Sequence, residues 1–515
     1  MAVTDFLERG TLINPEGPCV IMGERQYTYR QMLKLMSRIA NGLIAAGFGI
    51  GRNAAVLSDN DPIAYGCTMG IMRSGMAYVP MDFRNSKEDN YKILDFGDCE
   101  ILFYQSRFHE QVYELRPRLP KLKHLICIDK SSDDIPSLTD WIEPFADFSP
   151  KQQVPLDATA WLQTGSGTSG DFKMTMQTHR QYHSFIANHL ICFPDPKPVM
   201  LAAAPITHAA GGLSYHILAC GGKLVVMEKP DPQLVLRAIQ EYKITKLFLP
   251  PTVIYRLLAQ PNVREFDYRS LKYLIYSAAP MLTDKLRIAL DVFGPVIAQG
   301  YGQTEALGIT SMSPEEYFVD GKVASDFRLS AAGRPAMPFS NVVIMNDSNE
   351  ILPLGEVGEI CVRGDQVMKG YYKNPYATQS TIIDGWCHTG DVGFFDEEGY
   401  LHINDRKKDM IISGGFNIYP SEIEQVISSF EAVQECAVIG VPDEDWGEAV
   451  KAVVELSPGK TVSDKEIISL CKERLGSVKA PKSVDFVDEL PRSLRGKVLK
   501  RELRERYWKG LKRKI

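Results

Sequence analysis

Apolar runs that read as buried strands alternate with helical patterns through most of this chain. The strand-like runs fall at 54–58, 158–162, 199–204, 223–227 and 246–249. Apolar residues recur at helical spacing at 31–46 and 232–242. Strands and helices that alternate in this way are typical of an α/β fold with a substantial parallel sheet. We therefore predict a large N-terminal domain built of α/β layers.

The pattern changes in the last third of the chain. Two β-rich runs between Asn341 and Val362 flank the polar segment 346–350, which predicts a hairpin. We place a β-rich subdomain at about 320–405, as the last part of an N-terminal domain that covers 1–405.

A polar cluster at 405–409 marks a domain boundary, and we place a hinge at 406–408. After it, Ser421–Glu424 has the sequence of a capping box that opens a helix. Strands are predicted at 437–441 and 449–456, and a helix from about Ser463. We therefore predict a small, mobile α+β domain at 409–515.

Composition and charge exclude several classes of protein. The chain has 515 residues, is 44% hydrophobic and 24% charged, and has a net charge of −6, which argues against a dedicated nucleic-acid binder. The ten cysteines are scattered without a CxxC pair, as in reduced cytosolic proteins. The first residues lack the pattern of a signal peptide, and no apolar run reaches the roughly 18 residues that span a bilayer. We expect a cytoplasmic protein with no transmembrane segment and no nucleic-acid partner, as a monomer or homodimer.

The C-terminal end is basic. Residues 488–515 contain eleven Lys or Arg and four acidic residues. A solvated helix face is the usual explanation, and a polyphosphate ligand or an anionic surface is the more specific one.

A glycine-rich loop at 164–173 follows the strand predicted at 158–162. Its glycines match the dinucleotide fingerprint GxGxxG, but the helix and the acidic residue that the fingerprint requires are missing. A Walker motif also fails, because no Lys follows Gly170 directly. Hydroxyls, backbone amides and Lys173 can together hold phosphates, and an ordinary flexible turn is the alternative.

Further motifs follow this loop in a fixed order. They are Thr178–His179, Ala204–Gly211, Ser277–Pro280, Gly300–Glu305, Trp386–Asp391, Arg406, Ser413–Gly415 and Leu494–Lys497. Together they resemble the adenylate-forming, AMP-binding superfamily, which includes acyl- and aryl-CoA synthetases, luciferases and the adenylation domains of peptide synthetases. The resemblance covers almost the full length and implies an AMP-forming acid–thiol ligase that uses ATP, Mg²⁺ and coenzyme A.

The resemblance also implies the residues that bind the nucleotide. The loop would hold the phosphates through Thr164, Gly165, Ser166, Gly167, Thr168, Ser169, Gly170 and Lys173. The adenosine would lie against Ser277, Ala278, Ala279, Tyr301, Gly302, Gln303, Asp391, Ile403 and Arg406. Within this set, Tyr301 stacks on adenine and Asp391 binds the ribose hydroxyls.

Catalytic roles come from the same resemblance. Thr304 would contact the α-phosphate, Glu305 would hold Mg²⁺ together with Thr168, and Lys497 would neutralise charge in the adenylation step. His208 would gate the acyl pocket, and Lys408 lies at the hinge position. Attack of a carboxylate on the α-phosphorus brings two anions together, so such cationic partners are what the chemistry requires.

The sequence specifies less closely which thiol accepts the acyl group and which carboxylic acid is activated. Only 18 residues follow Lys497, so we expect free CoA rather than a fused carrier as the acceptor, and a separate carrier protein is the alternative. CoA would contact Gly414, Gly415, Trp446, Lys479 and Lys482. The acyl group would contact His208, Ala209, Gly212, Ala278 and Gly300. Segment 206–214 has no acidic residue to hold an α-ammonium, and its small residues predict an apolar pocket for an aryl, alicyclic or medium- to long-chain acid.

Four positions depart from the family pattern. Gly165 replaces Ser or Thr, Phe172 replaces Pro, Met174 replaces Gly, and Asp405 replaces Gly. Loss of a hydroxyl, of a stiff Pro and of backbone space affects the phosphate loop. Two hypotheses follow: a complete two-step ligase with an atypical loop, which we prefer, or a ligase with weak adenylation that performs mainly the thioester step.

Overall fold

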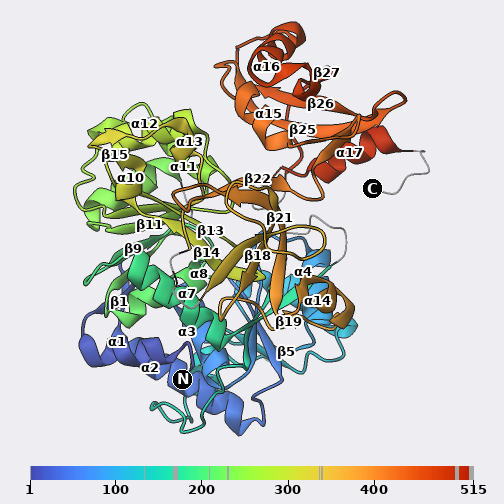
Figure 1. Ribbon diagram of the computed structural model, residues 1–515. Helices are drawn as coiled ribbons and strands as arrows, with labels where there is room; N and C mark the ends of the chain where they lie inside the picture. The colour runs from blue at the N-terminus through green and yellow to red at the C-terminus, as the bar shows by residue number, and fades with distance from the viewer. Residues whose placement is uncertain are drawn as a thin grey trace.

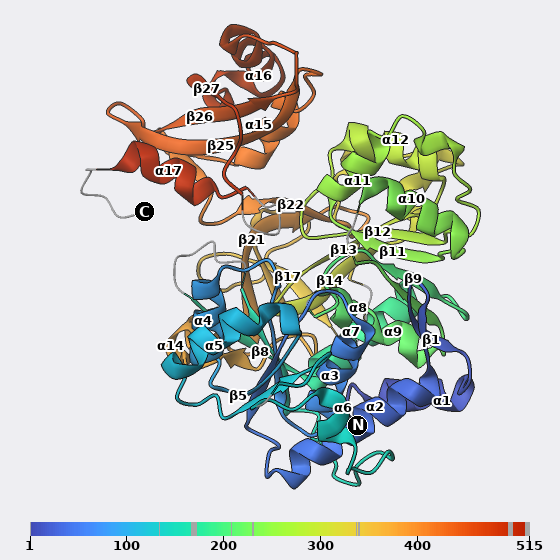
Figure 2. The ribbon, with the colours of Figure 1, turned by 180° about the vertical axis from the view of Figure 1, so that it is seen from behind.

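The structure is a computed structural model that describes residues 2–132, 134–165, 172–207, 209–228, 231–335, 337, 340–492 and 498–509. A large N-terminal domain carries a small C-terminal domain at one end (Figures 1 and 2). This mixed α/β architecture confirms the predicted fold class. No described helix is long and apolar enough to cross a membrane, and all ten cysteines are unpaired.

The largest sheet in the described chain has eight strands in the order β14-β13-β12-β11-β9-β10-β1-β2. The strands from β13 to β1 in this order are parallel, whereas β14 and β2 pair antiparallel at the edges. The strands are β1 (Pro18–Met22), β2 (Arg25–Thr28), β9 (Val199–Ala202), β10 (Lys223–Val226), β11 (Lys246–Leu249), β12 (Tyr273–Tyr276), β13 (Ile297–Gln303) and β14 (Ala306–Met312).

A second, seven-stranded sheet has the order β19-β8-β7-β4-β3-β5-β6. Its strands are β3 (Asn53–Leu57), β4 (Ala77–Pro80), β5 (Cys99–Tyr104), β6 (His124–Cys127), β7 (Thr159–Thr164), β8 (Met174–Thr178) and β19 (Gly370–Tyr371). Along β3, Ala54 and Val56 face one core and Ala55 and Leu57 face another. A parallel strand that is buried on both faces explains the continuous apolar run in the sequence.

Helices fill the space between the two sheets and cover their outer faces. The inner core contains α1 (Asp5–Ile13), α2 (Tyr29–Ala45), α3 (Pro62–Arg73), α7 (His179–Cys192), α8 (Ala209–Leu213) and α9 (Tyr215–Ala219). The outer face of the eight-stranded sheet is covered by α10 (Pro232–Glu241), α11 (Pro251–Leu258) and α12 (Thr283–Phe293). The outer face of the other sheet is covered by α4 (Lys87–Phe96) and α5 (His109–Leu115).

Local sequence explains where these helices begin. Thr28 and Gln31 form a capping box at the start of α2, and Asp231 caps α10, whose first residue is Pro232. The remaining short elements of this domain are α6 (Leu138–Ile142), α13 (Asp326–Leu329), α14 (Pro375–Thr381), β15 (Phe318–Val319), β16 (Lys322–Val323) and 3₁₀ turns at Ser106–Phe108, Arg116–Arg118, Val263–Glu265 and Pro314–Tyr317.

An antiparallel sheet occupies the segment predicted to be β-rich. Its strands are β17 (Asn341–Met345), β18 (Gly358–Arg363), β20 (Ile382–Ile383), β21 (Trp386–Phe395) and β22 (Leu401–Arg406). The predicted hairpin is confirmed, with Met345 opposite Glu359. The connection is longer than the five polar residues, because β18 begins at Gly358.

The small domain has one sheet in the order β24-β23-β26-β25, with β27 on β26. Its strands are β23 (Ile411–Ser413), β24 (Phe416–Ile418), β25 (Val433–Asp443), β26 (Gly447–Leu456) and β27 (Ser483–Val487), and its helices are α15 (Pro420–Ile427), α16 (Asp464–Lys479) and α17 (Lys500–Trp508). The helix predicted from about Ser463 is confirmed, since Ser463 and Glu466 form the capping box of α16.

The capping box predicted at Ser421–Glu424 is wrong. Helix α15 begins at Pro420, so its N-cap is Tyr419 rather than Ser421, and the Tyr419 side chain makes no capping bond. The backbone amide of Ser421 donates instead to Asp405 Oδ2 at 2.9 Å. Glu424 Oε1 accepts from the amide of Val438 at 2.7 Å. The Asp405 carboxylate, from β22, therefore accepts the hydrogen bond from the start of α15 that the Ser421 side chain was expected to accept.

Candidate functional site

Most of the predicted nucleotide residues that the structure describes in the large domain lie at or near the ends of parallel strands. Thr164 is the last residue of β7, Gln303 is the last of β13, and Ser277 directly follows β12. In open α/β sheets, ligands bind outside the carboxyl ends of the strands. The antiparallel strands β21 and β22 bring Asp391 and Arg406 to the same place.

Tyr301, Asp391 and Arg406 are in direct contact. Tyr301 Oη donates to Asp391 Oδ2 at 2.7 Å, and Arg406 Nε lies 3.0 Å from Asp391 Oδ1. Burial, followed by the charge of Asp391, raises the pKa of the Tyr301 hydroxyl well above its usual value. Ile403 packs beside Tyr301 in the same apolar cluster. The structure thus brings Tyr301, Asp391 and Arg406 together, although Tyr301 and Arg406 are 105 positions apart in the sequence. The resemblance implies the same grouping.

A second group surrounds Glu305. Thr304 Oγ1 donates to Glu305 Oε2 at 2.7 Å, and Tyr371 Oη donates to Glu305 Oε1 at 2.8 Å. Lys173 Nζ lies 5.3 Å from the centre of the Tyr371 ring, within cation–π range. The carboxylate of Glu305 and the ammonium group of Lys173 therefore both contact Tyr371. They lie near the ends of β13 and β7, which belong to different sheets.

Backbone contacts fix this arrangement. Gln177 Nε2 donates to the carbonyl of Thr304 at 3.0 Å, and the amide of Met368 donates to the carbonyl of Glu305 at 2.7 Å. Gln303 Nε2 donates to the carbonyl of Thr389 at 3.3 Å. The turn after β13 is consequently tied to β8, to the segment before β19 and to β21.

The glycine-rich loop connects two antiparallel strands, β7 and β8. Ser166, Gly167, Thr168, Ser169 and Gly170 lie outside the described residues. At the base of the loop, the amide of Gly165 donates to the carbonyl of Lys173 at 3.2 Å.

Two of the atypical loop residues have packing roles. Met174 is fully buried in the core beneath the seven-stranded sheet. Phe172 packs edge-on against Phe96, with ring centres 5.2 Å apart. The Met174 side chain therefore belongs to the core rather than to the loop surface.

The predicted acyl-binding residues have different surroundings. Ala278 has a φ of +73°, which is strained for a residue with a Cβ and is a feature that often marks functional sites. A Cβ placed on Gly300 would meet no atom within 4 Å, so this position faces open space. A Cβ on Gly212 would lie 3.1 Å from the Tyr182 ring. Close packing against Tyr182 therefore explains the glycine at 212, whereas the open space beside Gly300 could receive part of an acyl group.

Two predicted catalytic residues, His208 and Lys497, lie outside the described residues. Ala209 begins α8, and Ala279 is exposed beyond β12. Gly302 permits the close pairing of β13 with β14, because a Cβ there would lie 2.8 Å from the amide of Gly308.

In the small domain, three of the predicted CoA residues lie together. The amide of Gly414 donates to the carbonyl of Trp446 at 2.9 Å, and Lys482 Nζ lies 5.5 Å from the centre of the Trp446 ring. Gly415 is next to them, with a φ of +83°. Lys479 is engaged elsewhere, in an ion pair with Glu422. No hydrogen bond or ion pair between described residues links this group to the Tyr301 cluster.

The predicted hinge, 406–408, begins at the last residue of β22 and continues into the segment before β23. The amide of Lys407 donates to the carbonyl of Gly390 at 2.8 Å, and Arg504 Nη1 of α17 donates to the carbonyl of Lys408 at 2.9 Å. Arg504 also forms an ion pair with Asp409. Burial lowers the pKa of the Lys408 ammonium group. The hinge role of Lys408 stays a prediction.

Sequence reasoning missed Tyr371. It lies in Gly370–Tyr371–Tyr372, a glycine followed by two aromatic residues, which is the signal that could have drawn attention to it. Its contact with Glu305 depends on β19 pairing with β8, and no local pattern predicts that pairing.

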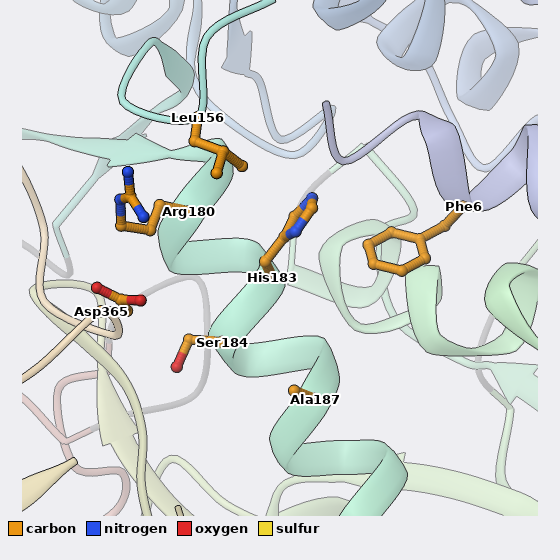
Figure 3. A pocket seen from close by; sticks show the side chains of 7 residues that line it. All are labelled: Phe6, Leu156, Arg180, His183, Ser184, Ala187 and Asp365. Carbon is orange, nitrogen blue, oxygen red and sulfur yellow. The ribbon is translucent and has the colours of Figure 1, made fainter. Parts of the chain in front are cut away.

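The surface hollow in Figure 3 is a separate feature. It has a volume of about 370 Å³ and lies between α1 and α7. The ring centres of Phe6 and His183 lie 5.1 Å apart with the rings tilted by 55°, and Arg180 forms an ion pair with Asp157 at 2.7 Å. Among the described residues, none of the predicted site residues lines it.

Known proteins share this architecture. Residues 7–372 match the family model described as AMP-binding enzyme, and residues 422–497 match the model described as AMP-binding enzyme C-terminal domain. Feruloyl-CoA synthase of an Amycolatopsis species is 35% identical over 97% of this chain and 98% of its own length. Medium/long-chain-fatty-acid–CoA ligase FadD8 of Mycobacterium tuberculosis is 33% identical over 97% of this chain and 89% of its own. The crystal structure of ATP-bound MatB from Rhodopseudomonas palustris has a TM-score of 0.88 and 29% identity, and covers 100% of both chains.

Proposed function

The chain belongs to the AMP-binding enzyme family, and from that premise we propose that it is an ATP-dependent, AMP-forming acyl-CoA ligase. It activates a carboxylic acid as acyl-AMP with release of pyrophosphate, and then transfers the acyl group to the thiol of CoA. The observation that carries this proposal is the convergence, around the end of β13, of the Tyr301–Asp391–Arg406 cluster and the Glu305–Tyr371–Lys173 group, whose members come from three different sheets.

The large domain binds and orients the nucleotide. Asp391 can accept from the ribose hydroxyls with its charge balanced by Arg406, and Tyr301 offers an aromatic ring next to them. Lys173, at the base of the glycine-rich loop, brings positive charge toward the phosphates. Fixed donors and charges of this kind stabilise the charge that develops at the α-phosphorus, and removal of one typically costs about 10²–10³ in rate.

The residues around Glu305 fit a Mg²⁺ ion that arrives with ATP. Among the described residues there is no group of three carboxylate, His or Cys side chains that would form a complete metal site. Mg²⁺ in nucleotide sites is commonly held by one or two carboxylates together with phosphate oxygens and water. Glu305, held by Thr304 and Tyr371, is such a carboxylate, and the bound ion would neutralise phosphate charge.

The thioester step would use the small domain. Gly414, Trp446 and Lys482 offer a turn residue without a side chain, an aromatic ring and a cation, which suit the pantetheine arm and the anionic nucleotide of CoA. Two orientations of the small domain serve the two steps, with the turn at Lys408 as the hinge.

We further propose a non-amino acid with an aryl, alicyclic or medium- to long-chain acyl group. The sequence neighbours named above include an aryl-CoA and a fatty-acid-CoA enzyme, and segment 206–214 lacks the acidic residue that an α-ammonium group would need.

A product screen by mass spectrometry tests the proposal. The purified protein is given ATP, Mg²⁺ and a panel of aryl, alicyclic and fatty acids, each with and without CoA. We expect acyl-AMP without CoA and acyl-CoA with it. Thioester that forms only from supplied acyl-AMP would mean that the atypical loop has lost the first step, and no product from either would contradict the proposal.

A further inference from the structure

Gln177 is a buried polar residue on an apolar sheet face. It lies on β8, opposite Trp161 of β7, and is 2% exposed. Trp161 belongs to the core between the two sheets, whereas Met174 and Met176 of β8 pack into the core on the other face. An amide in an apolar core is costly unless both its donor and its acceptor are bonded. The partners of Gln177 therefore have to account for its place.

Both ends of the Gln177 amide are bonded. Its Nε2 donates to the carbonyl oxygen of Thr304 at 3.0 Å, and its Oε1 accepts from Tyr182 Oη of α7 at 3.0 Å. A carbonyl oxygen can only accept, so it fixes which end of the amide faces Thr304. Burial raises the pKa of the Tyr182 hydroxyl well above its usual value, so this group stays a donor. The three residues form a chain of hydrogen bonds that runs from α7 to Thr304.

This chain ends on the turn that carries the predicted α-phosphate and Mg²⁺ contacts. Thr304 and Glu305 are the two residues between β13 and β14. Two-residue hairpin loops favour conformations with positive φ, and neither Thr304 nor Glu305 has a positive φ. The turn therefore depends on contacts from outside the hairpin. Gln177 binds the carbonyl of Thr304, and the amide of Met368 binds the carbonyl of Glu305.

The other end of the chain is rigid. The Tyr182 ring packs against the rings of Trp161 and Tyr215, with centres 5.3 and 6.0 Å away. A Cβ on Gly212 of α8 would lie only 3.2 Å from Tyr182 Oη. Tyr182 thus has little freedom to move, and its hydroxyl holds the Gln177 amide in one orientation. A core residue of α7 therefore fixes the carbonyl of Thr304 through Gln177.

We propose that Gln177, oriented by Tyr182, is a positioning residue of the adenylation step. By holding the carbonyl of Thr304, it fixes the direction in which the Thr304 hydroxyl and the Glu305 carboxylate face the substrate. Groups that stabilise charge in a transition state have to be fixed in place before the reaction. The inference rests on the proposed function and adds two residues that act through Thr304 and Glu305 rather than on the substrate.

Two variants remove the chain in steps. Gln177→Met keeps the length of the side chain without its hydrogen bonds, and Tyr182→Phe removes only the hydroxyl. We expect kcat for ATP–pyrophosphate exchange to fall by about 10–100-fold in Gln177→Met, because small displacements of reacting groups are that costly. Tyr182→Phe should lose about 3–10-fold, the worth of one hydrogen bond. The KM for the acid should stay within about twofold, because the loss is confined to the transition state.

Tyr29→Phe is the matched control. Tyr29 is fully buried in the same core as Tyr182, and its hydroxyl donates to the carbonyl of Gly222 at 2.8 Å, outside the chain that leads to Thr304. In urea unfolding it should lose stability as Tyr182→Phe does, while its exchange rate stays within about twofold of the wild type. Equal losses of exchange in the two variants would assign the effect to general destabilisation and overturn the proposal.

Gln177→Glu tests the donor directly. A protonated carboxyl group donates to the carbonyl of Thr304 as the amide does, whereas an ionised one faces it with an acceptor. Since burial raises the pKa of a carboxyl group, exchange by Gln177→Glu should approach the wild-type rate near about pH 6 and fall about tenfold below it by about pH 9. Full activity at every pH would mean that the group stays protonated, and Gln177→Met then decides. Loss of activity at every pH would contradict a donor role.

Calorimetric titration of ATP into the full chain, at a series of Mg²⁺ concentrations and without acid or CoA, measures positioning without turnover. Gln177→Met should need about tenfold more Mg²⁺ than the wild type for half-maximal ATP binding, because residues that orient a metal ligand support metal affinity. If the wild type binds ATP with Mg²⁺ but shows no exchange with any acid, the proposed function fails and this titration alone decides the role of Gln177. An unchanged Mg²⁺ dependence would then overturn the inference, as would an unchanged kcat of Gln177→Met if the wild type is active.

Discussion

At the scale of single residues, charged groups in this protein are held by neighbours from distant segments. Glu305 accepts hydrogen bonds from Thr304 beside it and from Tyr371, which comes 66 positions later. Asp391 is held in the same way between Tyr301 and Arg406. Such positioning fixes a carboxylate before the substrate arrives, which is how electrostatic catalysis avoids reorganisation during the reaction.

The hydroxyl of Tyr371 should matter for adenylation only. Tyr371→Phe removes one hydrogen bond to a charged carboxylate, so we expect ATP–pyrophosphate exchange to slow by about 10–100-fold. Thioester formation from supplied acyl-AMP should keep its rate, because that step has no pyrophosphate to position. Tyr372→Phe is the matched control, since the Tyr372 hydroxyl bonds to Asp98 instead. Equal losses in the two variants would contradict the assignment.

Lys246 should make stability depend on pH. Burial lowers the pKa of its ammonium group in the folded state to about 8, below the ordinary value of 10.5, so above pH 8 the unfolded chain binds more protons and stability rises with pH up to about 10.5. Between pH 7.5 and 9.5, wild type should gain about 2 kcal/mol relative to Lys246→Met, as measured by urea unfolding at both values. A constant difference between the two proteins would show that Lys246 keeps its ordinary pKa in the folded state.

At the scale of elements, the turn between β23 and β24 shows how backbone geometry prepares a candidate CoA contact. Gly414 and Gly415 have φ values of +56° and +83°, which suit the two central positions of a tight hairpin turn. A Cβ on Gly414 would lie 2.4 Å from the Trp446 ring, whereas one on Gly415 would meet no atom within 4 Å. Gly414 is therefore required both for its backbone conformation and to avoid a clash with Trp446, whereas Gly415 is required for its backbone conformation alone.

Alanine at each glycine should separate these demands. Gly415→Ala places a side chain in the left-handed region and should cost about 1–2 kcal/mol. Gly414→Ala adds the clash with Trp446, and we expect a further 1–3 kcal/mol in the free energy of unfolding of the small domain. Urea titration of both variants measures the difference. Equal destabilisation would mean that Trp446 moves aside freely.

At the scale of the whole molecule, two contacts tie the junction between domains to the small domain. Asp405, at the end of the β-rich sheet, accepts from the first turn of α15, and Arg504 of α17 bonds to Lys408 and Asp409 in the connecting segment. Asp405 is one of the positions that departs from the family pattern. The departure therefore affects how the small domain is held, rather than the nucleotide cluster directly.

Loss of the Asp405 carboxylate should loosen α15. Asp405→Ala leaves the amide of Ser421 without its acceptor, at a cost of about 1 kcal/mol, so hydrogen exchange in 420–427 should accelerate by roughly fivefold. Asp405→Asn keeps an acceptor oxygen and should change exchange much less. Exchange in Asp405→Ala that matches wild type would show that the helix terminus finds another acceptor.

Several features of this protein follow from the sequence alone. The parallel-sheet class, the strand Lys246–Leu249, the start of α16 and the hairpin β17–β18 could all be predicted, because each depends on local periodicity or local capping. The ordered motifs also identified the family and the candidate nucleotide residues.

Only the tertiary structure revealed the contacts that depend on long-range pairing. Asp405 caps a helix that a local Ser was expected to cap, and Tyr371 reaches Glu305 through β19. The run 246–249 predicts a buried strand, but not that the buried ammonium group of Lys246 finds its acceptor in the carbonyl of Phe193, just beyond α7. Local patterns indicate which face of a helix or strand is apolar. They do not specify which distant segment packs on that face or supplies the hydrogen-bond acceptor there. Those partners are decided when the sheets and helices pack.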